Sequence, residues 1–351
     1  MKKILIVDYL GNCNEQGVPL GHPIKIINEY QELLSDNFEV DIMVPANMAS
    51  HVKGNVIKKL KYSISQYSVG VVAKSRNVLG RLVNIKEILK NKHYDEIWFC
   101  NIDFYLFFYL MLYRRDCSKI ICTLYRRDFS GDKVMVKLKN RIMYKVLPRL
   151  GLVICSNTNI LSDRYKCFYM PDYFYIPEKY EPYRYCIKEN KVVCLGTMGE
   201  NKRLYELVKA FNQINYPLEI VGNFVDKELL DKLNAIKGDH IVIHDDYLSE
   251  EEYLSRMASA KYCILPYNME LYHDRTSGVV LEAIFLKCIP IAPKELLDFT
   301  DIRGISYQEL NDLITIDLQY SFSECVERNE KMIEETYNRD LIKSSLWNIL
   351  E

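Results

Sequence analysis

Short apolar runs alternate with longer amphipathic stretches along the chain, and this alternation restricts the folds open to it. In the first half, the apolar runs that read as strands are 3–9, 40–45, 96–100, 119–125 and 151–157. Helical periodicity separates them, as between Pro23 and Leu34, where five apolar side chains share one face. Strands that are apolar throughout and separated by helices predict a parallel sheet covered on both faces.

The same pattern restarts after residue 190. Strands are expected at 191–197, 217–223, 240–245, 262–267 and 288–293, with helices at 204–214, 226–236, 250–260 and 279–286. A long polar helix from about 321 to 336 and a short final helix follow. Residues 170–185 separate the halves and hold three prolines and many tyrosines without a regular period. Proline at this density resists regular structure and predicts a domain junction.

The 351 residues are enough for two domains. We therefore predict an α/β protein with an N-terminal Rossmann-like domain over 1–175 and a C-terminal one over 186–335. The last residues, 336–351, form a helix that could pack back on the N-terminal domain. In such sheets ligands bind beyond the carboxyl ends of the strands. Two sheets facing one another would leave a cleft for two substrates.

The composition is typical of a reduced, cytoplasmic protein. Most of the eleven cysteines lie inside apolar runs, and no C-x-x-C pair occurs. The N-terminus lacks the features of a signal peptide, because Asp8 ends its short apolar run. The longest apolar stretch, 104–113, is too short to span a membrane and predicts a buried helix, with monotopic membrane contact as the alternative.

Charge is divided unevenly between the halves. Residues 1–189 hold 29 Lys and Arg against 19 Asp and Glu, whereas the remaining residues hold 17 against 28. Basic residues concentrate at 51–92 and 114–149. This asymmetry is either drift in surface composition or the mark of an anionic partner. We expect an anionic membrane surface in preference to nucleic acid, because no nucleic-acid-binding motif accompanies the charge.

The segment 265–293 contains the largest group of candidate functional residues. A strand ends near Tyr267, a polar loop follows, and Thr276, Ser277 and Gly278 open a helix that contains Glu282. Free amides at a helix start favour a phosphate, and a glycine there leaves room for the ligand. Arg275 adds a cation that suits phosphate. Asp274 is either a helix cap or a ligand contact, whereas Glu282 lies too deep in the helix to cap it.

This segment resembles the acid-x7-acid signature of retaining GT-B glycosyltransferases, especially family four. The family pattern E-G-F-G-x-x-x-x-E reads here from Asp274 to Glu282, with Asp in place of the first Glu and with shifted glycines. The resemblance implies that Asp274 contacts the donor sugar and that Glu282 holds the ribose hydroxyls. The backbone around Thr276, Ser277 and Gly278 would then bind the diphosphate.

Two further segments resemble the donor domain of the same family. In 192–214, Gly196 and Lys202 align with the family's G-R-L-x-x-x-K-G entry, while Thr197 replaces its arginine. Lys202 would neutralise the diphosphate, and either Arg203 or Arg275 could supply the missing cation. In 240–267, Tyr247 is either a stacking partner for the nucleobase or an ordinary surface tyrosine.

The N-terminal half resembles the family less closely. The loop 11–23 carries Gly17, Gly21 and His22, which match a G-G-x-x-x-H loop only loosely and are also ordinary turn chemistry. After the strand 119–125, Arg126, Arg127 and Asp128 are candidates for the acceptor side of the cleft or a charged loop end. The family often has a histidine near here, and this chain has Tyr125.

The resemblance implies transfer of a hexose from a nucleoside-diphosphate-sugar to an acceptor hydroxyl, with retention. No metal or cofactor is expected, because no D-x-D motif stands in a convincing loop and helix amides with cations can replace a metal. Asp274, Lys202 and Arg275 would be the catalytic residues. The acceptor would be a saccharide or lipid-linked saccharide of surface polysaccharide or glycolipid synthesis, met at the inner face of the plasma membrane. The alternatives are a GT-B-fold nucleotide-sugar epimerase and a non-catalytic scaffold that binds a nucleotide sugar. A dehydrogenase is disfavoured because no G-x-G-x-x-G fingerprint follows the first strand.

Overall fold

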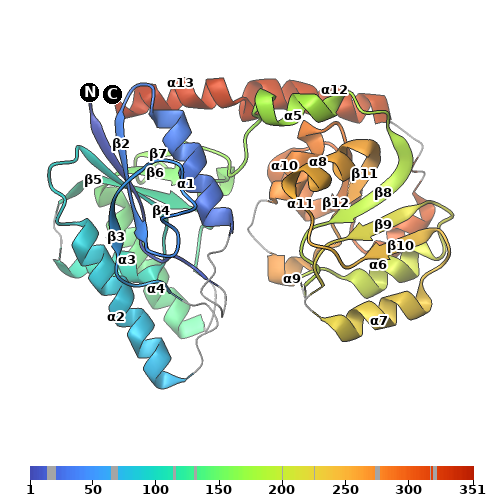
Figure 1. The fold of residues 1–351 in the computed structure, drawn as a ribbon, viewed down its shortest axis with the longest axis horizontal. Coiled ribbons are helices and arrows are strands. Elements are labelled where there is room, and N and C mark those ends of the chain that lie inside the picture. Colours follow the sequence, from blue (N-terminus) through green and yellow to red (C-terminus); the bar gives the residue numbers. More distant parts are fainter. Residues whose placement is uncertain are drawn as a thin grey trace. The chain divides into compact units, whose positions relative to one another are not determined.

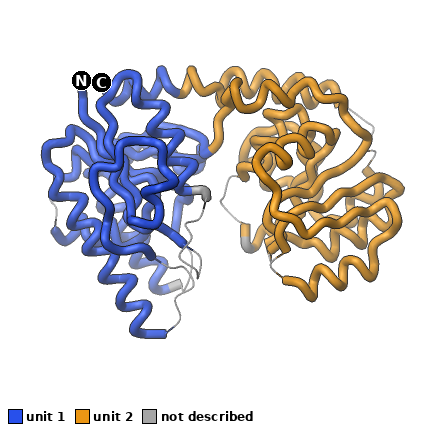
Figure 2. The backbone as a smooth tube through the Cα atoms, in the orientation of Figure 1, with its two compact units in different colours: residues 1–172, 343–351 blue, residues 173–342 orange. Residues whose placement is uncertain are grey.

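The structure is a computed structural model. It describes residues 1–13, 21–64, 70–113, 116–129, 133–199, 201–224, 226–272, 277–316, 318 and 322–351. The chain forms two compact units, shown in Figure 2. The first comprises Met1–Asp172 together with Lys343–Glu351, and the second comprises Tyr173–Ile342.

The first unit is built on a seven-stranded sheet with the order β3-β2-β1-β4-β5-β6-β7, in which all neighbours run parallel (Figure 1). Its strands are β1 (Lys3–Asp8), β2 (Glu39–Pro45), β3 (Asn55–Leu60), β4 (Glu96–Asn101), β5 (Cys117–Leu124), β6 (Leu150–Cys155) and β7 (Cys167–Tyr169). The central strands are almost wholly buried, as their uninterrupted apolar runs predict.

Helices cover both faces of this sheet. On one face lie α2 (Val71–Ile88), α3 (Phe104–Tyr113) and α4 (Lys133–Val146), whose buried residues share one core cluster. On the other face, Tyr30 of α1 (Gly21–Leu34) stacks on Trp98 with ring centroids 4.6 Å apart. The end of α13 (Arg339–Leu350) joins that layer, where Trp347 donates a hydrogen bond to the carbonyl of Leu33 at 2.8 Å.

The second unit repeats the plan with a six-stranded parallel sheet of order β10-β9-β8-β11-β12-β13. Its strands are β8 (Glu189–Leu195), β9 (Leu218–Val221), β10 (Ile241–His244), β11 (Ala260–Ile264), β12 (Ile289–Pro293) and β13 (Ile305–Tyr307). Two core clusters lie on its two faces. In both sheets the strand order reverses beside the first strand, which is the arrangement of a Rossmann-like fold.

The helices of the second unit pack on both of these cores. They are α5 (Pro177–Arg184), α6 (Leu204–Phe211), α7 (Lys227–Ile236), α8 (Glu250–Ser259), α9 (Met269–Tyr272), α10 (Gly278–Phe285), α11 (Lys294–Thr300) and α12 (Phe322–Met332). A π-helical turn over Ile333–Tyr337 leads into α13, which crosses the boundary between the units. The polar helix expected over 321–336 is therefore α12 with this turn.

The expectation that 170–185 lacks regular structure was wrong, because this segment contains α5. Pro177 stands at the helix start, where its missing amide hydrogen costs nothing. Tertiary contacts hold the helix: Tyr180 is buried against Phe285, and Arg184 donates to the carbonyl of Phe285 at 2.7 Å.

The loop expected over 11–23 ends earlier than predicted, because α1 already begins at Gly21. Pro23 falls in the first turn of this helix, where proline is tolerated. No strand was predicted for β3, whose side chains include exposed Lys58 and Lys59 at the sheet edge.

All eleven cysteines lie in the described ranges, and each is a free thiol. The apolar stretch 104–113 forms α3, which packs into the core through Leu106, Phe107 and Leu110. None of the described helices has the length and apolar character that crossing a bilayer requires.

Candidate functional site

The start of α10 lacks a side-chain cap. Ser277 occupies the N-cap position, but no backbone amide bonds to its side chain. Its hydroxyl lies 3.1 Å from the hydroxyl of Tyr267 instead. The first turn contains no acidic residue. The amide of Val280 donates to the carbonyl of Ser277 at 3.1 Å, whereas the amides of Gly278 and Val279 have no acceptor among the described residues. These two amides are therefore available to an anion, which the helix dipole also favours.

Gly278 was expected to leave space for a ligand, but in the structure the ring of Tyr173 lies in that space. A β carbon at Gly278 would lie 2.4 Å from ring atoms of Tyr173. The glycine is therefore needed for the close approach of this ring to the helix start. Tyr173 is the first residue of the second unit and was not among the predicted site residues.

Glu282 lies one turn further along α10 and is only 9% exposed. It interacts with Tyr253 of α8. Burial raises the pKa of Tyr253 well above its usual value, and the negative charge of Glu282 raises it further. A carboxylate this deep in an apolar helix is not a cap, as the sequence predicted.

Lys202 belongs to the loop between β8 and α6, and backbone contacts tie this loop to the segment that approaches α10. Lys202 forms an antiparallel bridge with Tyr267, the residue whose hydroxyl contacts Ser277. On either side, the amide of Arg203 donates to the carbonyl of Pro266 at 2.7 Å, and the amide of Asn268 donates to that of Asn201 at 2.8 Å. The two candidate phosphate-binding segments are thus brought together.

The ammonium group of Lys202 is buried, with the residue 9% exposed. It donates to the carbonyl of Leu195 at 2.9 Å and lies 3.7 Å from the sulfur of Met198. Within the described ranges, no carboxylate lies within ion-pair distance of it. Burial raises the pKa of the Cys263 thiol, the nearby charge of Lys202 lowers it and that of Glu282 raises it, so both charged groups lie in the neighbourhood of this residue.

A cavity of about 300 Å³ adjoins these groups at the carboxyl ends of β8, β9 and β10. It is lined by Gly196, Thr197, Gly222, Asn223, Asp246, Tyr247, Leu248, Ser249, Glu250 and Tyr253. Tyr253 connects it to Glu282, and a β carbon on Gly196 would lie 3.9 Å from the Lys202 nitrogen. Cavity, lysine and glutamate therefore form one continuous site.

Two glycines shape this cavity. Gly196 has φ +100°, which favours glycine, and its carbonyl oxygen would lie 1.7 Å from a β carbon on Gly222. The loops after β8 and β9 can therefore approach each other only with glycine at 222. Tyr247 stands at the rim with 92% of its surface exposed, as a residue that could stack on a base would.

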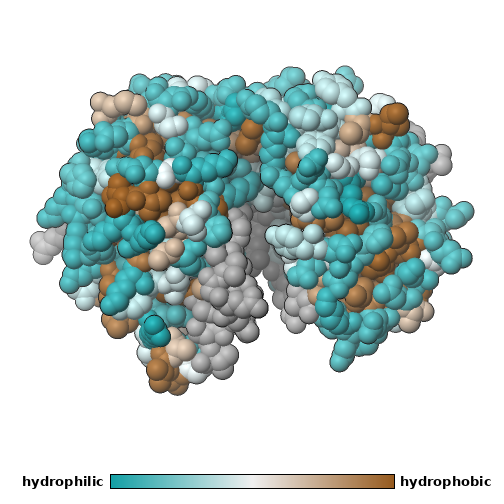
Figure 3. Space-filling view, viewed as in Figure 1, coloured by the Kyte–Doolittle hydropathy of each residue, from teal (hydrophilic) through white to brown (hydrophobic). Residues whose placement is uncertain are grey.

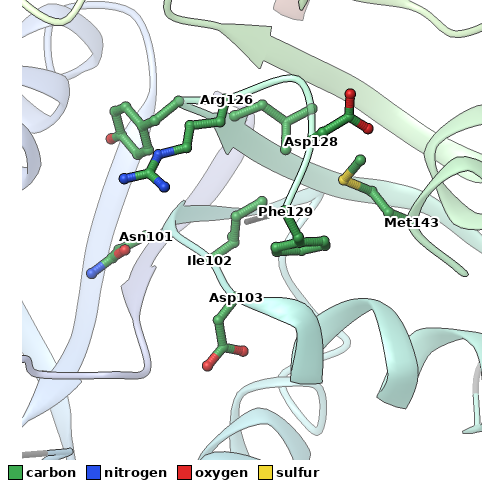
Figure 4. Close-up of a pocket in the computed structure, with 9 residues that line it drawn as sticks. Asn101, Ile102, Asp103, Arg126, Asp128, Phe129 and Met143 are labelled. Carbon is green, nitrogen blue, oxygen red and sulfur yellow. The ribbon is translucent and has the colours of Figure 1, made fainter. Parts of the chain in front are cut away.

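The first unit has a cavity of about 370 Å³ at the carboxyl ends of β4 and β5, drawn in Figure 4. Its lining residues are Asn101, Ile102, Asp103, Leu124, Tyr125, Arg126, Asp128, Phe129 and Met143. The hydroxyl of Tyr144 lies 3.1 Å from a carboxylate oxygen of Asp128, and Asp103 forms an ion pair with Arg81 at 2.6 Å. Apolar and polar side chains both line this cavity, as is common in small-molecule sites.

Two of the three predicted acceptor residues line this cavity, and the third does not. Arg126 and Asp128 line it, whereas Arg127 is exposed outside the lining and its carbonyl accepts from Tyr144 at 3.2 Å. Tyr125, which stands where the family often has histidine, donates to the carbonyl of Cys100 at 2.9 Å. Asn101 and Asp103 were missed, although their place directly after a strand could have indicated them.

Several predicted residues lie outside the described ranges or only partly within them. Gly17, Asp274, Arg275 and Thr276 belong to segments that the structure does not describe. For Gly21 and His22 only the backbone is described, at the start of α1. Arg203, one of the two candidates for the second diphosphate cation, forms an ion pair with Glu309 at 2.8 Å.

Comparison with known proteins identifies the fold. Neither a protein-family model nor a curated protein matches the sequence. Among solved structures, the chain is similar to a sucrose-phosphate synthase from Thermosynechococcus elongatus, at 13% identity and a TM-score of 0.67, covering 100% of this chain and 98% of that one. It is also similar to HepE of Anabaena, solved with UDP and glucose, at 13% identity and a TM-score of 0.62, covering 100% and 99%.

A third similar structure is the trehalose-6-phosphate protein of E. coli bound with UDP-2-fluoro glucose, at 10% identity and a TM-score of 0.67, covering 99% of this chain and 98% of that one. At these identities the similarity concerns the fold. The two Rossmann-like sheets and the full-length similarity show that this chain has the GT-B fold of such glycosyltransferases.

Proposed function

We propose that this chain is a retaining glycosyltransferase that moves a hexose from a nucleoside-diphosphate-sugar to an acceptor hydroxyl. The second unit would bind the donor and the first unit the acceptor. The GT-B fold supports this division, because in open α/β sheets ligands bind beyond the carboxyl ends of the strands. Both cavities described above lie at such ends.

The buried ammonium of Lys202 is the observation that carries the proposal. A buried charge is normally paired, because leaving it without a counterion is costly. Within the described residues, the partners of this ammonium are a carbonyl and a thioether. A diphosphate would supply a negative charge that the described residues do not, beside Gly196 and the uncapped start of α10.

In this proposal each donor group has a distinct task. Lys202 and the amides of α10 stabilise the diphosphate as it leaves, which is where charge develops in the transition state. Arg275 adds a second cation, Asp274 contacts the sugar, and Glu282 accepts hydrogen bonds from the ribose. The base occupies the cavity at Thr197 and Tyr247. No metal or cofactor takes part, so activity should persist in EDTA, and loss in EDTA with recovery on added magnesium would contradict this.

On the acceptor side, we propose a saccharide or lipid-linked saccharide of surface polysaccharide or glycolipid synthesis. Arg126 and Asp128 would contact its polar groups, and Phe129 offers an apolar ring face within the same cavity. Gly17, together with Gly21 and His22 at the start of α1, would contact the substrates. The reaction would take place at the cytoplasmic side of the membrane.

The donor site can be tested with a thermal-shift screen of UDP, GDP, ADP, CMP and their sugars. A ligand that binds only the folded state raises the unfolding midpoint, so the correct base should stand out. Glu282→Gln should remove this shift while leaving the ligand-free midpoint close to that of the parent. Glu228→Gln, at an exposed position of α7, is the control. Unchanged binding in Glu282→Gln would place the donor elsewhere.

A second measurement separates transfer from the two rival functions. The preferred nucleotide sugar is incubated with and without candidate acceptors, and its fate is followed by mass spectrometry. Transfer requires an acceptor and releases the nucleoside diphosphate, while an epimerase converts the sugar without one. Binding with no consumption of the donor under either condition would indicate a scaffold.

A further inference from the structure

The starts of α2 and α4 expose large apolar side chains to solvent. Val71 and Val72 of α2 are 81% and 83% exposed, and Val134 of α4 is 76% exposed. Met135 and Leu138 of α4 are also exposed. Figure 3 shows brown surface at the lower tip of the first unit, where Figure 1 has the start of α2. None of these side chains belongs to the core cluster beneath the helices.

Cations alternate with these apolar residues on the same helix faces. Val72, Arg76 and Leu79 recur at intervals of four and three residues, so they form one exposed stripe on α2. Val134, Leu138 and Arg141 form the corresponding stripe on α4. Over the two helices the sequence has nine Lys and Arg and one acidic residue, Glu87.

The stability of α2 and α4 themselves does not account for exposed apolar residues and cations at their starts. Neither helix has an acidic residue in its first turn, where a negative charge would be stabilising. Cations early in a helix oppose its dipole, and exposed valines gain nothing from burial. The pattern therefore needs a partner that accepts both positive charge and apolar side chains.

The sheet topology places the starts of α2 and α4 at the same sheet edge as the cavity lined by Arg126. In a parallel sheet, a connecting helix begins where its preceding strand ends. The helix α2 follows β3 and α4 follows β5, and α3 packs in the same core between them. The cavity near Arg126 lies at the ends of β4 and β5, on the same edge.

The geometry points to the exposed faces at the starts of α2 and α4 as a surface that binds anionic lipid bilayers. Its apolar residues are Val71, Val72, Leu79, Val134, Met135 and Leu138, and its cations are Lys74, Arg76, Lys137 and Arg141. The valines enter the headgroup region while the cations meet lipid phosphates, as in other interfacial helices. This inference concerns attachment only, and it stands whether or not the proposed transfer reaction occurs.

Vesicle flotation of the full chain tests the inference. Binding is expected to vesicles of phosphatidylcholine mixed with phosphatidylglycerol and not to phosphatidylcholine alone. Each cation near the surface contributes about fivefold in affinity, so Lys74→Gln with Lys137→Gln should weaken binding about 25-fold. Val72→Ser with Val134→Ser should also weaken it, because the apolar contribution is lost.

The matched control removes the same charge from the far ends of the same helices. Lys86 and Lys145 are exposed, and they lie about 18 Å and about 12 Å along α2 and α4 from Lys74 and Lys137. Both distances exceed the Debye length of about 8 Å at physiological salt. The variant Lys86→Gln with Lys145→Gln should therefore retain nearly all binding. Equal losses in the two double variants would overturn the proposed surface.

Two further results would also overturn it. One is insensitivity to the serine substitutions together with equal retention of a nucleic-acid duplex, which would indicate a general polyanion surface. The other is self-association in light scattering that disappears with the serine substitutions, which would indicate a second copy as the partner. Glu282→Gln should still float with anionic vesicles, so failure of the donor site and failure of this surface can be told apart.

Discussion

The ring of Tyr173 lies against Gly278 so closely that a β carbon at Gly278 would be 2.4 Å from it. These two residues belong to the second unit, one at its first position and one at the start of α10. The contact fixes an aromatic ring at the helix end proposed to hold the diphosphate. Changes at either residue should therefore affect both stability and donor binding.

Gly278→Ala should lower stability by about 1–3 kcal/mol, because the new methyl group overpacks against the ring or displaces it. In the background of Tyr173→Ala the same substitution should cost much less, since the obstructing ring is gone. Denaturant unfolding of the two single variants and the double variant measures this coupling. Gly199→Ala is the control, because the nearest atom to a β carbon there is 3.4 Å away. Strictly additive effects would argue against the contact.

Lys202→Met should reduce donor affinity about 10- to 100-fold, because an ammonium that binds a phosphate contributes about 1.5–3 kcal/mol. Stability should change by less than about 1 kcal/mol, since replacing a buried charge by an apolar side chain of similar volume is often neutral or stabilising. Calorimetric titration with the preferred nucleotide and thermal unfolding provide the two measurements.

Lys188→Met is the matched control, and for it we expect a loss of stability without a loss of nucleotide affinity. The ammonium of Lys188 donates to the carbonyls of Ala258 and Leu286 at 2.6 and 2.7 Å, and burial lowers its pKa. Its loss should therefore destabilise the second unit and leave nucleotide affinity unchanged in the folded fraction. If both lysine variants lose affinity equally, Lys202 has no special relation to the donor.

Arg126→Gln should raise the KM for the acceptor and leave the affinity for the donor nucleotide unchanged, because this side chain lines the cavity of the first unit. Arg127→Gln removes the same charge from the neighbouring exposed position outside the cavity and should have little effect. Initial rates at varied acceptor concentration, with saturating donor, make the comparison. An effect from Arg127 alone would mean that the acceptor lies outside the cavity.

Much of the fold could be predicted because strands buried on both faces of a sheet appear in the sequence as continuous apolar runs. The buried parts of β1 and β8 are continuous apolar runs, and each strand is followed by a segment of helical periodicity. The edge strand β3 carries exposed lysines and lacks that signal. The helix α5 was missed because its two prolines oppose helix formation locally, while packing of Tyr180 and Arg184 overrides that tendency.

The candidate site was predictable where it depends on local chemistry. Lys202 and Glu282 could be selected because the helix dipole and capping do not explain a cation at a helix start or a carboxylate inside a helix, and Ser277 because it opens a helix whose amides favour phosphate. Tyr173 and Tyr253 could not, because their roles depend on contacts across the fold with Gly278 and Glu282. Tyr173 lies in the tyrosine-rich junction 170–185, where no local pattern distinguishes it from its neighbours.

Tyr267→Phe should weaken nucleotide binding through its effect on Ser277. The hydroxyl of Tyr267 holds the hydroxyl of Ser277, which therefore does not cap α10. Without that partner, Ser277 can turn toward the free amides, stabilising the helix by about 1 kcal/mol and competing with the diphosphate. The stacking of residue 267 on Tyr272, with centroids 4.0 Å apart, should survive in the phenylalanine variant.

Adding Ser277→Ala to Tyr267→Phe provides the decisive comparison. Alanine cannot cap, so the amides of α10 become available again and nucleotide affinity should return toward that of the parent. Isothermal titration of the parent, the single variant and the double variant measures the recovery. A double variant that binds no better than Tyr267→Phe would show that the tyrosine hydroxyl acts on the nucleotide by another route, and that the uncapped helix start is not what the diphosphate contacts.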